Sequence, residues 1–367
     1  MLFLSNPVAS AAGMLDQLRD PEDGWIDASG FLLNRDLSFL PVPVIITEPA
    51  LDSGLGAAGV FFHKRPEDET RESDVFERPS VSTIAGAVTG NESWFVGGGH
   101  LGIWQHDTLR YTGGAGYGSI NLEFYGDPDD PARGLDFNGE GVFILQNLKW
   151  RLGQSDWWVG GEWQYAAVDI EIKDDVPSTN FQPDELDFKN SAIGAIVEFD
   201  NRDTTFTPSS GARFRAQALY YDEVIGSDFE YRNYLTDYQH FFRLGSKWVV
   251  AARLDGSFID GRAPFFAKPF ISMRGIPQMR YQGDAVVVAE AEARWDFHPR
   301  LSFVGFAGVG KAANSLDDLS TQPSRVTRGI GLRYFLAKAL GLRVGIDVAR
   351  GPEETAFYLT LGHSWAQ

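Results

Sequence analysis

AVVVAEAEARWDF, residues 285–297, alternates apolar with polar side chains over most of its length. Successive side chains of a β-strand point to opposite faces, so the alanines of this stretch share one face with Trp295 and Phe297. The opposite face carries the charged residues Glu290, Glu292, Arg294 and Asp296. One face therefore suits hydrocarbon and the other suits water, as in a strand that separates lipid from a hydrated interior.

The same unit recurs along the chain from Val42 to Trp365. Each copy has about nine to fourteen alternating residues, followed by a break rich in Gly, Pro, Asp, Asn or Ser. About sixteen copies predict an all-β protein, a transmembrane antiparallel β-barrel with both termini on the periplasmic side. The 40 glycines and the 13% of aromatic residues favour this fold, because glycines let a curved sheet bend and aromatic side chains form belts at membrane interfaces.

The chain shows no change of composition that would divide its 367 residues into domains. Residues 42–367 are interpreted as one barrel and residues 1–41 as an N-terminal extension. The small residues from Ala9 to Ala12 resemble a signal-peptide cleavage site, although no basic segment precedes them. No run reaches the roughly 20 apolar residues of a transmembrane helix. The expected location is the bacterial outer membrane, with outer-membrane lipids, including lipopolysaccharide, as partners.

The net charge of −18 argues against a nucleic-acid partner, because phosphate binding needs a positive face. Most of the acidic residues lie in the breaks, notably within residues 67–74, 127–136 and 174–187. They are interpreted as solvated loop tips. The alternative is that they bind divalent cations between the loops and anionic lipid headgroups.

The sequence contains no strong motif for catalysis, a metal or a cofactor. Residues 54–59, GLGAAG, match a dinucleotide-binding fingerprint, but no helix-forming pattern follows them. The six histidines are isolated in sequence, and no G-x-S-x-G nucleophile motif is present. We therefore expect no enzyme, metal or cofactor. An outer-membrane lipid hydrolase with a Ser-His-acid set on the barrel wall is an alternative that the sequence leaves open.

Two segments are not explained by alternation. In residues 200–211, three charged residues followed by a proline and a glycine predict a turn fixed by ion pairs and by Asp side chains that accept backbone N–H groups. Residues 261–284 form a loop with many apolar and aromatic groups. Such a loop should not extend into water, so it is expected to fold back into the lumen, where Arg274 could pair with acidic wall residues.

Both segments resemble motifs of one family. The residues concerned are Asp200, Arg202, Asp203, Pro208 and Gly211 in the turn, and Met273, Arg274, Gly275 and Ile276 in the loop. They are similar to the D-x-R-D…P-x-x-G turn and the V-R-G-F/Y loop of BamA/TamA-type outer-membrane barrels, the bacterial surface antigen family of the Omp85 superfamily. Residues 292–295, EARW, resemble the E-x-R-aromatic stretch that follows this loop in the family. The matches keep the family's order and cover the chain from about Val42 onward.

This resemblance implies a barrel that assists the folding, insertion or secretion of other proteins, with the loop arginine docked on acidic wall residues. It gives Arg274 this role, with Glu292 as the expected partner and Glu290 as a second candidate. The family's F-x-D-x-G stretch reads FAGVG at residues 306–310, so its acidic partner is missing there. The forty or so residues before the first strand are too few for a periplasmic POTRA domain, and a barrel-only member is expected.

The first segment contains Pro41 and Pro43, and each proline removes a backbone donor. If this strand meets the last one, the seam between them has fewer hydrogen bonds than the other strand pairs; alternatively, the prolines only lead into the strand. The preferred hypothesis is a barrel with an occluded lumen and a role in protein or lipid insertion, for a client that the sequence does not identify. The alternatives are a passive channel or structural barrel, and the lipid hydrolase.

Overall fold

A computed structural model describes residues 19–32, 39–63, 80–125, 134–173 and 187–365. These residues contain sixteen strands: β1 (Phe39–Ile46), β2 (Gly54–His63), β3 (Ser80–Thr89), β4 (Trp94–Trp104), β5 (Leu109–Tyr125), β6 (Gly134–Arg151), β7 (Trp157–Ile172), β8 (Asp187–Asp200), β9 (Gly211–Tyr221), β10 (Tyr231–Leu244), β11 (Trp248–Gly261), β12 (Ala285–Trp295), β13 (Leu301–Ala313), β14 (Arg325–Ala337), β15 (Leu342–Arg350) and β16 (Thr355–Leu361). The helical elements are α2 (Ser29–Leu32), η1 (Pro49–Leu51), η5 (Glu223–Ile225), η6 (Phe265–Ala267), η7 (Asp317–Ser320) and η8 (Lys338–Leu340). No helix in the described part of the chain is long and apolar enough to cross a membrane.

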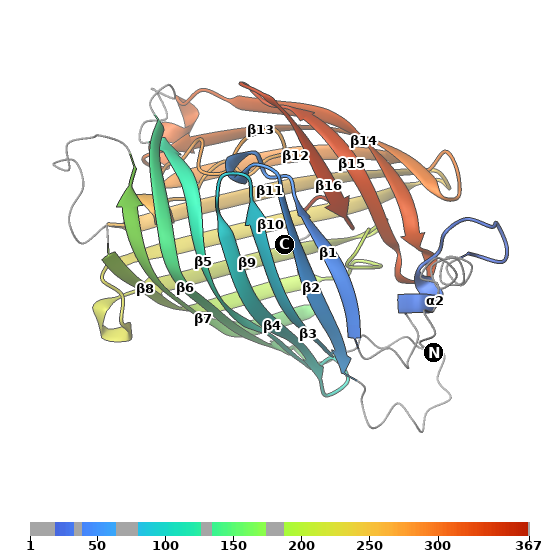
Figure 1. Ribbon diagram of the computed structural model, residues 1–367, viewed down its shortest axis with the longest axis horizontal. Coiled ribbons are helices and arrows are strands. Elements are labelled where there is room, and N and C mark those ends of the chain that lie inside the picture. The colour runs from blue at the N-terminus through green and yellow to red at the C-terminus, as the bar shows by residue number, and fades with distance from the viewer. Residues whose placement is uncertain (1–18, 33–38, 64–79, 126–133, 174–186, 366–367) are drawn as a thin grey trace, which may run out of the picture.

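The strands form a single sheet in sequence order, and each strand pairs antiparallel with the next (Figure 1). This confirms the predicted barrel of about sixteen strands. The GLGAAG stretch lies inside β2 and not in a nucleotide-binding turn. The predicted signal-peptide remnant, and all or most of the acidic breaks at residues 67–74, 127–136 and 174–187, lie outside the described residues.

The side chains of β12 alternate between the outer face of the barrel and the lumen. Val287 and Trp295 point outward and are 40% and 42% exposed. Glu290 and Arg294 point inward and are 4% and 5% exposed. Because the side-chain period of a strand is two, this register places every charged residue of the strand on the luminal side.

The sheet is nearly closed, but no ladder joins its first and last strands. Within the described residues, no strand pairing connects β1 with β16. The Leu359 N–H donates across this seam to the Thr47 hydroxyl oxygen at 3.3 Å. The ladder between β1 and β2 is continuous although Pro41 and Pro43 have no N–H to donate. The backbone nitrogens of the two prolines must therefore lie on the seam side of β1. The free edge of β1 consequently lacks two hydrogen-bond donors.

After β16 the chain turns into the barrel. Gly362, at φ +84°, adopts a left-handed conformation that favours glycine. Trp365 then lies buried against Phe241 of β10 and Ala251 of β11. The alternating pattern predicts a last strand over residues 354–365, and this is wrong at its end. The strand stops before Gly362 because the following side chains find apolar and charged partners inside the lumen.

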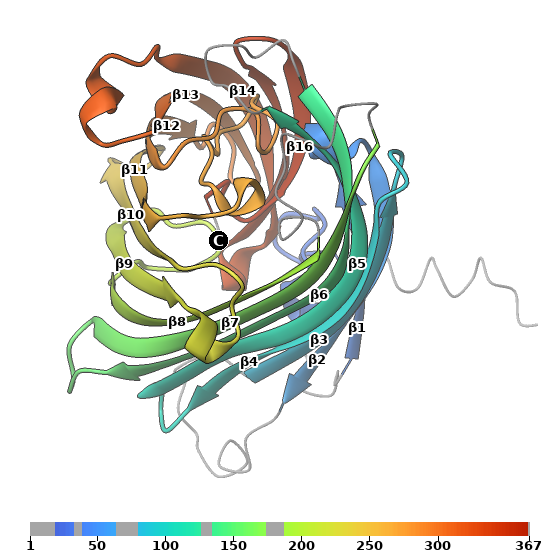
Figure 2. The same ribbon diagram turned by 90° about the vertical axis from the view of Figure 1, so that its left-hand side faces the viewer.

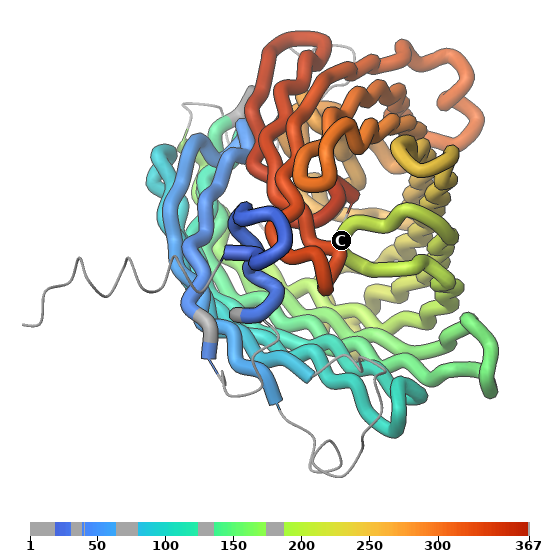
Figure 3. Tube along the Cα trace, turned by 90° about the vertical axis from the view of Figure 1, so that its right-hand side faces the viewer, coloured from blue at the N-terminus to red at the C-terminus, as the bar shows by residue number. Residues whose placement is uncertain are grey.

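Residues 19–32, the N-terminal segment, dock at the end of the barrel with the short turns, the periplasmic end in this class of barrel (Figure 3). The Ala28 N–H donates to the Leu336 carbonyl at 2.7 Å. Arg300, in the turn before β13, is fully buried beneath this segment. Its guanidinium forms ion pairs of 2.5, 2.7 and 2.8 Å with Asp20, Asp23 and Asp27. Charge-assisted hydrogen bonds thus hold the segment in place.

Arg300→Met is expected to release the N-terminal segment, because three carboxylates lose their shared cation. In this cysteine-free chain, an Ala28→Cys probe should then react with a maleimide at least several-fold faster. Lys338→Met is the control with the smaller effect, since Lys338 is one-third exposed and pairs with Asp20 and Asp23 only. Equal labelling rates in the presence and absence of Arg300 would contradict this description.

Acid should also release this segment. Hydrogen bonds from Lys338 and Arg300 lower the pKa of Asp20 and of Asp23, respectively. A lowered pKa stabilises the docked state above the ordinary value of 3.8, and the contribution is lost as the pH falls through the lowered value. The segment should stay docked at pH 5 and become sensitive to pepsin only well below pH 3.8. Cleavage in this segment at pH 5 would show that the carboxylates do not hold it.

Candidate functional site

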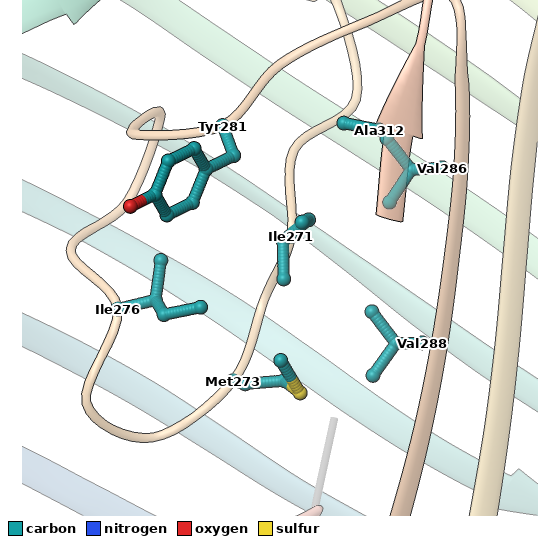
Figure 4. Close-up of a cluster of buried hydrophobic side chains, with 7 residues drawn as sticks. All are labelled: Ile271, Met273, Ile276, Tyr281, Val286, Val288 and Ala312. Atoms are coloured by element: carbon teal, nitrogen blue, oxygen red, sulfur yellow. The ribbon is translucent and has the colours of Figure 1, made fainter. Parts of the chain in front are cut away.

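The loop between β11 and β12, residues 262–284, folds back inside the barrel (Figure 2). Phe270 and Gln282 form an antiparallel bridge that brings the two arms of the loop together. Side chains from both arms then pack on the luminal face of the wall (Figure 4). The cluster consists of Ile271, Met273, Ile276 and Tyr281 of the loop, Val286 and Val288 of β12, and Ala312 of β13.

Arg274 lies at the tip of the loop and is almost completely buried. Its guanidinium pairs with Asp347 of β15 at 2.7 Å and with Glu292 of β12 at 2.9 Å. It also donates to the Ser364 hydroxyl at 2.8 Å and lies 3.4 Å from the centre of the Phe306 ring. Charge-assisted bonds and a cation–π contact in a site that excludes most water are stronger than their exposed equivalents.

Asp347 is the centre of this charged cluster. It is fully buried, and it pairs with Arg333 of β14 at 2.9 Å as well as with Arg274. Ser364, from the segment that follows β16, accepts hydrogen bonds from both arginines at 2.8 and 3.3 Å. The loop, two strands and the C-terminal segment therefore meet at one carboxylate.

The structure separates the two acidic candidates of β12. Glu292 contacts Arg274 directly, whereas Glu290 pairs with Arg253 of β11 at 2.8 Å. Arg253 in turn donates to the Ser272 carbonyl of the loop at 2.9 Å. Glu290 thus supports the loop through a second arginine.

Sequence reasoning missed Asp347, which contacts the loop arginine more closely than Glu292 does. The signal was present, because Asp347 is the only acidic residue on the polar side of residues 342–350. It was not recognised because the family motif suggests an acid in the strand after β12, where this chain has glycines and Val309.

Gly275 allows the loop to approach the wall closely. It has φ +92°, and its N–H donates to the Tyr358 hydroxyl of β16 at 2.8 Å. A Cβ added here would lie 2.8 Å from the backbone nitrogen of Gly351. Only glycine fits this position without displacing backbone.

Gly275→Ala is expected to lower the temperature at which the barrel changes its gel mobility on heating. Gly226→Ala is the matched control, because Gly226 has a similar φ of +85° but no atom within 4 Å of an added Cβ. The control carries only the backbone strain, about 1–2 kcal/mol, while Gly275→Ala adds a backbone clash. Equal shifts for the two variants would mean that the loop does not sit tightly against Gly351.

The same loop contacts both edges of the seam. On one side, the Gln278 N–H donates to Glu48, just after β1, at 3.2 Å. Burial raises the pKa of this carboxyl group. On the other side, Gly275 bonds to Tyr358 of β16, and Tyr281 donates to Glu353 at 2.6 Å. The loop therefore bridges the two edges of the seam.

The turn between β8 and β9 lies at the end of the lumen where the short turns are found. Arg202 pairs with Asp200 at 2.8 Å, and Asp203 accepts the Ser209 N–H at 2.9 Å. Gly211, at φ +96°, begins β9. The turn motif thus consists of short-range charge contacts that fix its backbone.

Pro208 extends this turn toward the opposite wall. Its carbonyl accepts a hydrogen bond from Arg294 of β12 at 3.3 Å, and Arg294 also donates to the Ser209 hydroxyl at 2.8 Å. The Arg343 N–H of β15 donates to Thr207 at 3.3 Å. The turn motif and the loop motif therefore contact the same two strands, β12 and β15, at different heights of the lumen.

Comparison with known proteins identifies similar barrels. The model of the family described as Omp85 superfamily domain matches residues 138–365, which is more than half of the chain. No curated protein sequence matches the chain. Many solved structures resemble it.

The BamA structure from Haemophilus ducreyi that lacks POTRA domains 1–3 has a TM-score of 0.56 and 12% identity, over 95% of this chain and 81% of that one. CdiB from Escherichia coli has a TM-score of 0.61 and 10% identity, over 94% of this chain and 65% of that one. CdiB from Acinetobacter baumannii has a TM-score of 0.57 and 12% identity, over 89% of this chain and 59% of that one. Likeness at these identities shows the fold alone, and this chain spans less than two thirds of the CdiB chains.

Proposed function

Because the chain belongs to the Omp85 superfamily of outer-membrane barrels, we propose that it assists the insertion or assembly of outer-membrane proteins or lipids at the seam between β1 and β16. In this proposal the loop around Arg274 occludes the lumen, and the free strand edges are the working surface. The proposed partners are outer-membrane lipids, including lipopolysaccharide, and a protein client.

The unpaired seam is the observation that carries this proposal. A free strand edge offers backbone N–H and C=O groups that can pair with a strand from another chain. Inside a membrane such pairing is strongly favoured, since each unsatisfied backbone group costs several kcal/mol in hydrocarbon. Pro41 and Pro43 remove two donors from the β1 edge, so an arriving strand is held there by fewer bonds than in a full ladder and can leave again.

The contacts of the loop support a link between lumen and seam. Gln278 and Gly275 bond to opposite edges of the seam, while Arg274 fixes the loop to the wall. A strand that parts the edges must break at least one of these bonds. The docked loop therefore favours the closed seam, and the proposal predicts that opening and loop release occur together.

A disulfide across the seam tests the proposal. Thr47→Cys with Leu359→Cys places thiols on residues already joined by a hydrogen bond across the two edges. Cells that depend on this protein should show an outer-membrane permeability defect when the bond is formed and recover when it is reduced. Because the chain has no native cysteine, a second disulfide cannot confuse the result.

Leu55→Cys with Val88→Cys is the matched control, because these outward-facing residues are paired partners within the β2–β3 ladder. A disulfide there crosses two strands that are already hydrogen-bonded and should leave the phenotype unchanged. The proposal fails if the oxidised seam variant protects the membrane as well as the oxidised control does.

A passive channel or structural barrel is the alternative function. It requires no opening of the seam, so both disulfides would be neutral. It also predicts a steady conductance from the unmodified protein, whereas the proposed occlusion by the loop predicts very little.

The lipid hydrolase alternative has one observation in its favour. Ser82, on the outer face of β3, lies 2.7 Å from His63 Nε2 and 2.9 Å from His100 Nδ1. Within the described residues, neither imidazole is hydrogen-bonded to a carboxylate, and the ladder around Ser82 engages the backbone donors that an oxyanion hole would need. Loss of function in Ser82→Ala, with normal folding, would be required to revive this alternative.

A further inference from the structure

The luminal wall formed by β1 to β6 is apolar. The registers of these strands place large apolar residues, glycines and alanines, with only a few neutral polar residues such as threonines, on the same inner face. Examples from the six strands, in order, are Val44, Val60, Val81, Leu101, Ile120 and Phe143. Among the described residues, the charged side chains on this face are confined to its periplasmic end, at Arg110, Lys149 and Arg151.

The opposite half of the lumen has the composition expected of a hydrated interior. Its walls carry buried charges such as Glu162 of β7, Arg213 of β9 and Asp347 of β15. The C-terminal segment and the tip of the loop pack on this side, around β10 to β15 (Figure 2). The start of the loop reaches further, because Phe265 packs in one cluster with Phe137 of β6 and Phe188 of β8. The lumen therefore has a charged half, which the loop and the C-terminal segment fill, and an apolar half, which the loop contacts at Phe137.

Part of the apolar half, beside the loop, is left uncovered by the residues that the structure describes. On its inner face Phe95, Leu101, Phe143 and Leu145 are 40%, 46%, 43% and 37% exposed. Barrels with water-filled lumens line them with polar side chains, and each large apolar group left in water forgoes a favourable transfer free energy. A contiguous exposed apolar surface of this kind marks a binding site.

A cavity of about 330 Å³ lies at the boundary between the two halves. Gly114, Phe143 and Leu145 line its apolar side, while Gln164, Asn190 and Tyr221 line its polar side. Its volume falls in the range of ligand pockets. A surface that is apolar on one side and carries neutral hydrogen-bonding groups on the other is complementary to an amphiphile.

The apolar wall begins at the seam. Val42 and Val44 of β1 continue the inner face of β2, and in the described part of the chain β1 has no ladder partner on its other side. A chain in the surrounding hydrocarbon could pass from the membrane to this wall without crossing the charged half of the lumen. The glycines of β4 and β5, among them Gly97, Gly99 and Gly116, leave a flat path along the wall.

We propose that the inner face of β1 to β6 binds an acyl chain of a membrane lipid, with the polar end of that lipid turned toward Gln164 and Asn190. This inference goes beyond the proposed function, and only the route into the lumen rests on the seam. The observations favour an acyl chain over a polypeptide, because the exposed part of the wall offers methyl, methylene and aromatic groups and few side chains that could hydrogen-bond to a backbone.

Photocrosslinking in vesicles tests this inference. The full chain would be reconstituted into phosphatidylethanolamine and phosphatidylglycerol with a trace of phospholipid that carries a diazirine in its acyl chain. Illumination, digestion and mass spectrometry then locate the crosslinks. Outward-facing Val142 should be labelled in any case, and the inference predicts that Leu101, Phe143 and Leu145 are labelled as well. Crosslinks confined to outward-facing residues would overturn it.

The variant Phe143→Gln with Leu145→Gln makes the wall polar without adding charge. Crosslinks at Leu101 should fall at least about tenfold, because two apolar contacts with the acyl chain are lost. Crosslinks at Val142, on the outer face of the same strand, serve as the internal control and should not change. The heat-dependent gel shift establishes that the variant is folded. Undiminished labelling at Leu101 in the folded variant would contradict the inference.

The seam disulfide separates this inference from the proposed function. If luminal labelling disappears when Thr47→Cys is bonded to Leu359→Cys, acyl chains reach the wall through the seam. If luminal labelling persists in the locked protein, the wall binds lipid but the seam is not its route. In that second case the inference about the wall stands while the seam-based proposal loses support.

Discussion

Arg274→Ala is expected to free the loop from the barrel wall. Removing one partner of a buried ion pair costs about 3–5 kcal/mol, since the carboxylates left behind keep their burial and lose their counter-charge. Asp347 and Glu292 would both lose a partner, although Arg333 still pairs with Asp347. The apolar cluster around Ile271 would then have to hold the loop without charge contacts.

Hydrogen exchange measures this release directly. The backbone bonds of the loop include those from Ile271 to Tyr281, from Ile276 to Met273 and from Gly283 to Pro269. Their amides should exchange faster by roughly two to three powers of ten in Arg274→Ala, while the amides of β5 to β7 keep their protection. Arg232→Ala is the control, because its pair with Asp260 is more than half exposed and contributes little. Unchanged loop exchange in Arg274→Ala would show that the cluster alone fixes the loop.

Asp347→Asn is expected to have the largest effect of any single charge removal at this site. It keeps the side-chain volume but leaves Arg274 and Arg333 facing each other without their shared carboxylate. Glu292→Gln should be milder, because Glu292 pairs with one of these arginines and is 15% exposed. The temperature of the gel-mobility shift should therefore fall further in Asp347→Asn than in Glu292→Gln.

A double-mutant cycle gives this prediction a second test. Arg274→Ala and Asp347→Asn remove parts of one network. The double variant should therefore lower the temperature of the gel-mobility shift by clearly less than the sum of the two single decreases. Additive effects, or a larger loss in Glu292→Gln than in Asp347→Asn, would mean that Asp347 is not the main partner of the loop arginine.

The strands follow from the sequence because lipid on one side and a polar lumen on the other impose a strict period of two. Residues 54–63, 109–125, 157–172 and 211–221 were predictable at both ends, since Gly, Asp or Pro breaks the pattern there. The inward path of the loop was also predictable, because its apolar residues need cover.

The remaining features depend on contacts between residues far apart in sequence. Asp347 meets Arg274 only because β15 returns to the loop after three further strands. In the sequence Arg300 has the features of an ordinary turn residue. Its role becomes evident only in the fold, where Asp20, Asp23 and Asp27 form ion pairs with it. Local patterning could not show that β16 ends early, because Ser364 and Trp365 continue the alternation but bond inside the lumen.

The central claim is that a loop held by Arg274 occludes the lumen of a barrel whose first and last strands, in the described residues, form no ladder with each other. Single-channel recording in planar bilayers tests it most directly. The unmodified protein should show little steady conductance, and Arg274→Ala should open large, long-lived channels. A large and steady conductance from the unmodified protein, or no gain in Arg274→Ala, would contradict the claim.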